Sequence, residues 1–236
     1  MRNIVAAFLA ASLGISAAAA EKYEAPEMEK IDPADLSKFK EAYTFYLEGV
    51  EYEKAESWTS ASQAYRQAIK IYPNYADAQY GFGRMAVRLG RLDEAEEALK
   101  TALALDPELY AAHSELGNVH YQRGEYNKAA YEFQEVLKND PNDAVARYNL
   151  GNALRNLGKP DKALAQYEKA FALEPENIDI LFNMALAYED AGKNEEAVAY
   201  FEKFIAAAKD DPDEAEWVQR AKEYIQELRE GGKGSK

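Results

Sequence analysis

The sequence predicts an all-α solenoid of five helix pairs with a C-terminal capping helix, and two periodic residue types predict it. Prolines recur at a constant interval, at Pro73, Pro107, Pro141 and Pro175. Alanines recur at the same interval, at Ala61, Ala95, Ala129, Ala163 and Ala197. A fixed period of about 34 residues is typical of stacked repeats, in which each copy contacts only its neighbours. Length alone would allow one or two globular domains, and the period overrides that expectation.

The amino-terminal segment, 1–20, has the layout of a secretory signal peptide. Positions 1–3 carry one positive charge, positions 4–15 are apolar, and small residues lead to Ala20 before Glu21. This order predicts cleavage after Ala20. An uncleaved anchor helix is the alternative, although an Ala-rich apolar stretch that ends at Ala20 is short for a bilayer. We therefore expect a periplasmic or secreted protein with no stable membrane insertion after cleavage.

A spacer and a helix start follow the predicted signal peptide. Residues 21–31 are charged and aperiodic, which indicates a flexible spacer. Asp32 can cap a helix and Pro33 is tolerated in its first turn, so a helix is expected to begin here. The repeat domain is accordingly placed at residues 32–229, and its first helix begins ahead of the first repeat.

Each repeat is expected to form two short helices. The repeats are placed at 42–75, 76–109, 110–143, 144–177 and 178–211. The eighth position is always small, which predicts close approach of a neighbouring backbone (Gly49, Gly83, Gly117, Gly151, Ala185). The fifteenth is glycine in four repeats, as suits the left-handed residue that ends a helix. The twenty-fourth is large and apolar and is expected to fill the space beside the small residues (Tyr65, Leu99, Phe133, Tyr167, Phe201).

A capping helix is predicted after the fifth repeat, at residues 213–229. Its apolar residues keep helical spacing, at Trp217, Ala221, Tyr224 and Leu228. A terminal repeat exposes an apolar face unless another element covers it, which this helix would do. Residues 230–236 contain three glycines and are expected to form a flexible tail.

The repeats resemble the tetratricopeptide repeat (TPR) family. The fourth copy matches its motif at Leu150, Gly151, Ala163, Tyr167, Ala170 and Pro175, and the third copy matches at Leu116, Gly117, Ala129, Phe133 and Pro141. The resemblance covers residues 42–211 and implies a right-handed superhelical solenoid of five TPR helix pairs. It also implies a scaffold with many possible partners, because a shared fold does not specify function. The fifth copy departs from the motif at Lys209, where proline is usual.

Composition argues against several other functions. The formal net charge of −14 would repel a nucleic-acid backbone. The absence of cysteine excludes disulfides, thiolate metal sites and a cysteine nucleophile. His113 and His120 lie about 10 Å apart along one helix and occupy core positions of the motif, so packing is expected rather than metal binding. No nucleophile or glycine-rich loop stands in a catalytic context, and we expect no enzyme, cofactor or metal.

The resemblance implies a concave groove lined by the first helix of each repeat. Transferred to this chain, the expected peptide-binding residues are Tyr80, Arg84, Arg88, Asn118, Tyr121, Tyr148, Asn149, Asn152, Arg155 and Asn183, with Ser114 and Phe182 beside them. Asparagine is unfavourable inside a helix, so a row of four suggests a use. A carboxamide can donate to and accept from a peptide amide, and Arg84 and Arg155 could meet acidic groups of a ligand. Some family members, including the O-GlcNAc transferase and kinesin light chain scaffolds, hold extended peptides with such asparagines.

These observations predict a non-catalytic scaffold that binds a peptide or protein segment in the groove, in cell-envelope assembly or secretion. The alternative for the asparagines is that they only bond neighbouring helices. The alternative for the whole chain is a self-assembling structural module of the envelope without a peptide ligand, so a homo-oligomer is possible. Binding to a C-terminal carboxylate is disfavoured, since Tyr46 and Val50 replace the Lys and Asn that it needs. Replacing Asn149, Asn152 and Asn183 with alanine is expected to abolish partner capture and leave melting nearly unchanged.

Overall fold

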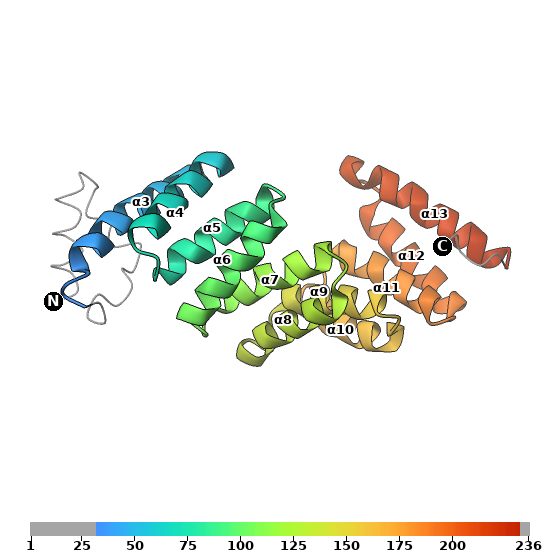
Figure 1. Ribbon diagram of the computed structural model, residues 1–236. Coiled ribbons are helices and arrows are strands. Elements are labelled where there is room, and N and C mark those ends of the chain that lie inside the picture. The colour runs from blue at the N-terminus through green and yellow to red at the C-terminus, as the bar shows by residue number, and fades with distance from the viewer. Residues whose placement is uncertain (1–31, 232–236) are drawn as a thin grey trace. The chain divides into compact units, whose positions relative to one another are not determined.

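The computed structural model describes residues 32–231, and every regular element in that range is helical (Figure 1). The all-α prediction is therefore confirmed. The chain divides into two compact units, which we call unit 1 (residues 32–107) and unit 2 (residues 108–231). The predicted signal peptide, the predicted spacer and residues 232–236 of the predicted tail lie outside the described residues. In the described part, no helix is both long and apolar enough to cross a membrane.

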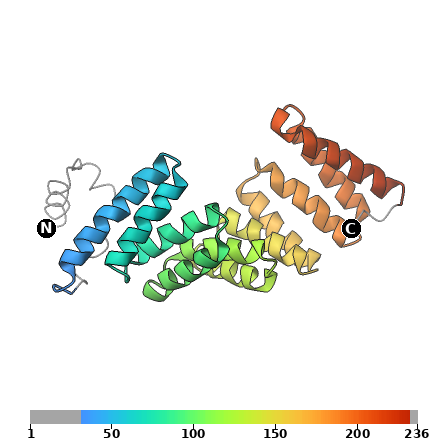
Figure 2. The same cartoon turned by 45° about the horizontal axis from the view of Figure 1, so that its top comes forward.

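Unit 1 consists of two helix pairs. Their bounds are α3 (Leu36–Lys54), α4 (Trp58–Ile71), α5 (Ala76–Arg88) and α6 (Leu92–Leu105). Within the unit, each helix lies beside the one that precedes it in the chain (Figures 1 and 2). Helix α3 begins at Leu36, a few residues later than expected. The reason is that the Asp32 carboxylate accepts the Ala34 N–H at 2.8 Å and closes a separate turn.

Unit 2 consists of three helix pairs and a final helix. Their bounds are α7 (Tyr110–Gln122), α8 (Tyr126–Asn139), α9 (Ala144–Asn156), α10 (Pro160–Leu173), α11 (Ile178–Asp190), α12 (Asn194–Ala208), the 3₁₀ turn η2 (Pro212–Glu214) and α13 (Ala215–Arg229). The α-helix of the cap starts slightly after the expected position 213. The Asp211 carboxylate accepts the Asp213 N–H at 3.0 Å, which holds the intervening residues in the tighter turn.

In the first four pairs, the eighth-position glycine of the first helix lies under the large twenty-fourth-position side chain of the second. A Cβ atom on Gly117 would lie 2.6 Å from a ring carbon of Phe133, and one on Gly151 would lie 2.5 Å from a ring carbon of Tyr167. The sequence interpretation expected a backbone at this distance. Instead, the twenty-fourth-position side chain itself occupies the space that the missing Cβ leaves. The two helices of a pair interlock for this reason.

The turn between the two helices of a pair uses a left-handed residue, as predicted. This residue has a φ angle of 71° at Gly90 and 67° at Gly158. Glu56 takes the same place in the first pair with a φ angle of 54°, a conformation that is uncommon for a residue with a side chain. In the other four pairs, the periodic glycine therefore marks where the first helix ends.

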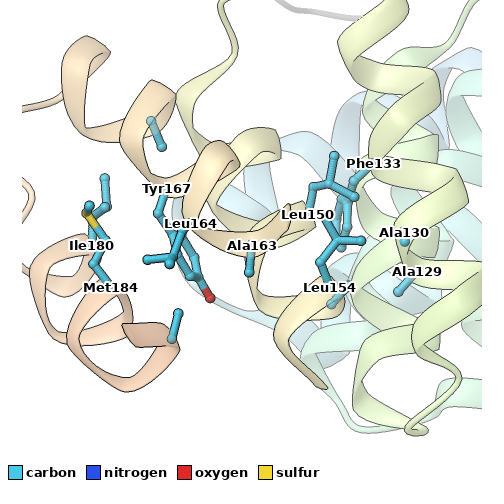
Figure 3. Packing of buried hydrophobic residues seen from close by; sticks show 13 residues of the cluster. Ala129, Ala130, Phe133, Leu150, Leu154, Ala163, Leu164, Tyr167, Ile180 and Met184 are labelled. Atoms are coloured by element: carbon cyan, nitrogen blue, oxygen red, sulfur yellow. The ribbon is translucent and has the colours of Figure 1, made fainter. Parts of the chain in front are cut away.

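Side chains from successive pairs form the core of unit 2. Figure 3 shows Leu150 and Leu154 of α9 between the α8 residues and Tyr167 of α10, with Ile180 and Met184 of α11 beyond. The final helix α13 covers the last pair: the Trp217 ring lies 5.3 Å from the ring of Phe182, and Tyr224 stacks on Phe201 at 5.1 Å. Each aromatic pair of this kind adds to the stability from burial alone. The predicted cap is confirmed.

Candidate functional site

The residues expected to bind a ligand lie on the first helices of the last four pairs, and we call the surface that they form the first-helix face. Unit 1 contributes Tyr80, Arg84 and Arg88 of α5. Unit 2 contributes Asn118 and Tyr121 of α7, Tyr148, Asn149, Asn152 and Arg155 of α9, and Asn183 of α11.

In unit 1, the two arginines of the face already have partners within the unit. Arg84 donates from Nη2 to the Glu53 carboxylate of α3, and its guanidinium lies 5.4 Å from the centre of the Tyr80 ring. Arg88 lies over the Trp58 ring of α4, at 4.6 Å. A guanidinium over an aromatic face is held by electrostatic attraction to the ring. These side chains are therefore held in place without a ligand.

Glu53 joins the face of unit 1 to the interior of the pair. Its side chain is only 15% exposed, and its second oxygen accepts a hydrogen bond from the Tyr65 hydroxyl. Burial, together with this hydrogen bond, raises the pKa of Tyr65 well above its usual value. One carboxylate thus accepts from both a buried phenol and Nη2 of the half-buried Arg84, whose Nε has no hydrogen-bond partner among the described residues.

In unit 2, tyrosines and asparagines of successive first helices bond to each other. Asn156 Nδ2 donates to Tyr121 Oη at 3.0 Å, and Asn183 Nδ2 donates to Tyr148 Oη at 2.8 Å. Each asparagine lies 35 residues after its tyrosine, which is one position more than the repeat period. Asn156 was not among the expected site residues, although this constant offset from a groove tyrosine could have identified it.

Asn152 bonds to the second helix of its own pair. Its Oδ1 atom accepts from the Tyr167 hydroxyl at 2.7 Å, and burial raises the pKa of Tyr167. Asn152 and Asn183 therefore act as the alternative interpretation expected, by bonding neighbouring helices. An alanine variant at these two positions is expected to lose stability, in contrast to the prediction from sequence for the triple variant.

Asn118 and Asn149 differ from the other asparagines of the face. Both are half-buried, and neither side chain forms a hydrogen bond with any described residue. Nearby on α9, Arg155 Nε lies 3.9 Å from the Asp190 carboxylate, which is a long and half-exposed ion pair. The first-helix face of unit 2 thus offers two carboxamides that the fold itself does not use.

Each histidine contacts a single carboxylate. His113 Nδ1 lies 2.6 Å from Glu132 Oε2, and His120 Nδ1 lies 2.7 Å from Glu125 Oε2. His120 is 2% exposed, so it is part of the core of the α7–α8 pair. Across residues 32–231, no group of three potential metal-binding side chains is found.

Comparisons with known proteins agree on the fold. A family model described as a tetratricopeptide repeat matches residues 46–109, 82–144 and 148–212. The MamA protein, in its crystal structure, superposes with a TM-score of 0.66 and 27% identity, over 75% of this chain and 94% of that chain. MamA from Desulfovibrio magneticus RS-1 superposes with a TM-score of 0.68 and 21% identity, over 72% of this chain and 97% of that chain. YrrB is described as a TPR protein with an unusual peptide-binding site. It superposes with a TM-score of 0.68 and 24% identity, over 77% of this chain and 92% of that chain. A comparison with curated protein sequences finds no match.

Proposed function

Since the chain belongs to the tetratricopeptide repeat family, whose members serve as scaffolds for protein–protein interaction, we propose that the first-helix face of unit 2 holds an extended peptide segment of a partner protein. The observation that carries the proposal is the pair of unbonded carboxamides at Asn118 and Asn149. They come from α7 and α9, which are successive first helices.

The chemistry of a carboxamide suits an extended backbone. Each peptide group presents one N–H donor and one C=O acceptor, and a carboxamide can satisfy both. An asparagine inside a helix lowers helix stability by about 0.5 kcal/mol relative to alanine. At Asn152 and Asn183 that cost is offset by hydrogen bonds to tyrosines. At Asn118 and Asn149 a ligand would supply the missing bonds.

The tyrosine–asparagine bonds support the same face in a second way. They fix the rings of Tyr121 and Tyr148, which stand beside the two unbonded amides on the same helices. A binding surface whose side chains are already ordered loses less conformational entropy when the ligand arrives. The face of unit 2 is in this sense prepared for a flexible partner.

The experiment compares two double variants of the full mature chain. Asn118→Ala with Asn149→Ala removes the unbonded amides, and Asn139→Ala with Asn194→Ala removes two amides outside the face. We expect the first variant to capture at least about tenfold less partner in crosslinking and pull-down from envelope extract. A decrease of this size corresponds to the loss of one or two hydrogen bonds to the partner. The control should capture partner as the parent does. Neither variant should lose more than about 0.5 kcal/mol of unfolding free energy, and replacement of two helix-interior asparagines by alanine is expected to add up to about 1 kcal/mol.

Equal capture by the two variants would contradict the peptide-binding proposal. Light scattering of the mature chain at micromolar concentration tests the rival, self-assembling function. A concentration-dependent oligomer together with unchanged capture would favour that rival.

We also propose that the chain is exported and acts in envelope assembly or secretion, as its amino-terminal segment, 1–20, suggests. The order of a charged start, an apolar stretch and small residues before Glu21 supports this proposal. The test is fractionation of the producing cells followed by determination of the amino-terminal residue. A chain that begins at Glu21 in the periplasm or medium is expected, and a full-length chain in the cytoplasm would contradict it.

A further inference from the structure

A surface cavity of about 400 Å³ lies between the second helices α8 and α10 of unit 2. We call it the α8–α10 cavity. Leu150, Leu154 and Leu157 of the α9 segment form its apolar wall, and Tyr131 of α8 stands beside it with 56% of its surface exposed. Figure 3 shows Leu150 and Leu154 with Ala130 of α8. None of the proposed peptide-binding residues of the first-helix face lines this cavity.

The corresponding position in unit 1, two repeats earlier, is filled from within. Arg66 of α4 lies over the Phe82 ring at 4.9 Å and pairs with the Glu94 carboxylate of α6. A cation, an aromatic ring and a carboxylate therefore bridge the two second helices of unit 1.

In unit 2 the equivalent positions cannot form that bridge. Two repeat periods further along the chain, Gln134 takes the place of Arg66, Leu150 that of Phe82, and Lys162 that of Glu94. Glutamine is shorter and uncharged, leucine has no ring, and the acidic position has become basic. These substitutions explain why the space between α8 and α10 remains open.

The next position along unit 2 is also filled, but by different residues. Leu154 and Gln166 line the α8–α10 cavity. One repeat later, their places are taken by Tyr188 of α11 and Tyr200 of α12, whose ring centres lie 5.1 Å apart in a stacked arrangement. An open space between second helices is therefore not a general property of these repeats. Side chains therefore fill this position in two different ways, in unit 1 and beside α12, whereas it is open at the α8–α10 cavity.

The charge of the cavity indicates what would fill it. Lys159 and Lys162 line it, no acidic residue does, and neither lysine forms an ion pair with a described carboxylate. This basic lining stands out in a chain with a net charge of −14. A ligand with a carboxylate for the lysines and an apolar side chain for the leucines would reproduce, with the charges reversed, the bridge of unit 1.

We propose that the α8–α10 cavity is a second protein-binding site, which takes an acidic segment of a partner that carries an apolar side chain next to a carboxylate. The apolar side chain lies against Leu150 and Leu154, and the carboxylate pairs with Lys162. This site is independent of the first-helix face, so a TPR scaffold of this kind can hold two protein segments at once.

The test uses the full mature chain and three capped synthetic pentapeptides. The probe is Gly-Asp-Leu-Glu-Gly, and the comparison peptides are Gly-Asp-Ala-Glu-Gly and Gly-Lys-Leu-Lys-Gly. In methyl NMR we expect the probe to shift the resonances of Leu150, Leu154 and Leu157 and to leave Leu99 of unit 1 unmoved. The comparison peptides should bind at least about tenfold more weakly, because each lacks one of the two contacts.

A charge swap provides the decisive variant. Gln134→Arg with Lys162→Glu recreates the arginine–glutamate pair of unit 1, so the side chains themselves should fill the cavity. We expect an unchanged or higher melting temperature and at least about a tenfold loss of probe binding. Lys169→Gln, which removes an exposed α10 lysine that does not line the cavity, is the matched control and should bind normally.

Three results would overturn the proposal: no shift of the leucine methyls at millimolar probe, full binding by the charge-swap variant, or equal binding of free glutamate. The last result would identify a small anion as the ligand. The Asn118→Ala, Asn149→Ala variant separates the two sites. It should bind the probe normally even though it loses the partner of the first-helix face.

Discussion

Units 1 and 2 differ at two places in how their polar side chains are paired. On the first-helix face, unit 1 joins Arg84 to Glu53, whereas unit 2 leaves Asn118 and Asn149 without hydrogen bonds. Between the second helices, unit 1 joins Arg66 to Glu94, whereas the corresponding α8–α10 cavity of unit 2 remains open.

This contrast indicates that equivalent surfaces of one repeat scaffold can either stabilise the fold or bind another molecule. Where charged and aromatic side chains meet, they satisfy each other and hold adjacent pairs together. Where amides and lysines stand without partners, the same positions become available to another molecule. Unit 1 pairs its charged side chains internally, although two of its buried atoms, Tyr75 Oη and Arg84 Nε, have no hydrogen-bond partner among the described residues. Unit 2 leaves half-exposed polar side chains unpaired and is the better candidate for binding. Three sets of variants test this contrast, in order of decreasing expected effect.

The largest loss of unfolding free energy is expected when the Glu53 carboxylate, which accepts from Arg84 and Tyr65, is removed. Glu53→Ala leaves Arg84 and the Tyr65 hydroxyl without their acceptor. Removing one partner of a fully buried pair costs about 3–5 kcal/mol. Because the Arg84 side chain is 34% exposed, we expect about 2–3 kcal/mol after screening by solvent.

The matched change in unit 2 is Asp190→Ala. This carboxylate is 53% exposed and lies 3.9 Å from Arg155, so we expect a loss of at most about 0.5 kcal/mol. Urea denaturation, followed by hydrogen exchange resolved for each unit, measures both changes. Equal losses for the two variants would contradict the contrast between the units.

A smaller difference in the loss of unfolding free energy is expected between two variants that each remove a buried tyrosine hydroxyl. Tyr65→Phe removes a hydrogen bond to the Glu53 carboxylate, and Tyr167→Phe removes one to the Asn152 amide. Hydrogen bonds to charged groups contribute about 1.5–3 kcal/mol, and neutral ones about 0.5–1.5 kcal/mol. Unit 1 should therefore lose more free energy of unfolding than unit 2 when the two variants are unfolded in urea. A larger loss in unit 2 would show that the charged bridge of unit 1 adds little.

The smallest effects sort the asparagines of unit 2 into two groups. Asn152→Ala leaves the fully buried Tyr167 hydroxyl without an acceptor, and Asn183→Ala removes the donor to Tyr148. We expect each change to lower stability by about 1 kcal/mol. Asn118→Ala and Asn149→Ala should leave stability unchanged or slightly raised, because alanine is the better helix former. Thermal melting of the four single variants separates structural amides from binding amides.

Much of the fold could be predicted from the sequence because residues with a known structural preference recur at the repeat period. Gly90 and Gly158 mark the turns, and Gly117 and Phe133 mark the interlocking of a pair. The start of α3 was less predictable, since Asp32 caps a turn of its own rather than the helix. The expected peptide-binding role of the first-helix residues stays a prediction.

The candidate site was predictable only as a set of positions. The period placed the arginines of unit 1 and the asparagines of unit 2 on equivalent helix faces. It gave no means to tell Asn149 from Asn152, although the two lie within one turn of the same helix. The distinction depends on whether a tyrosine hydroxyl lies within hydrogen-bond distance.

The amino-acid sequence alone therefore specifies the solenoid, since a regular alternation of small and large side chains at the repeat period has one efficient way to pack. Which polar side chains the fold uses is settled only by three-dimensional contacts. Glu53 and Arg84 are 31 residues apart, and Tyr148 and Asn183 are 35 residues apart, so each pair forms only when neighbouring helices come together. A hydrogen bond depends on differences of a few tenths of an ångström, which a repeat pattern does not encode.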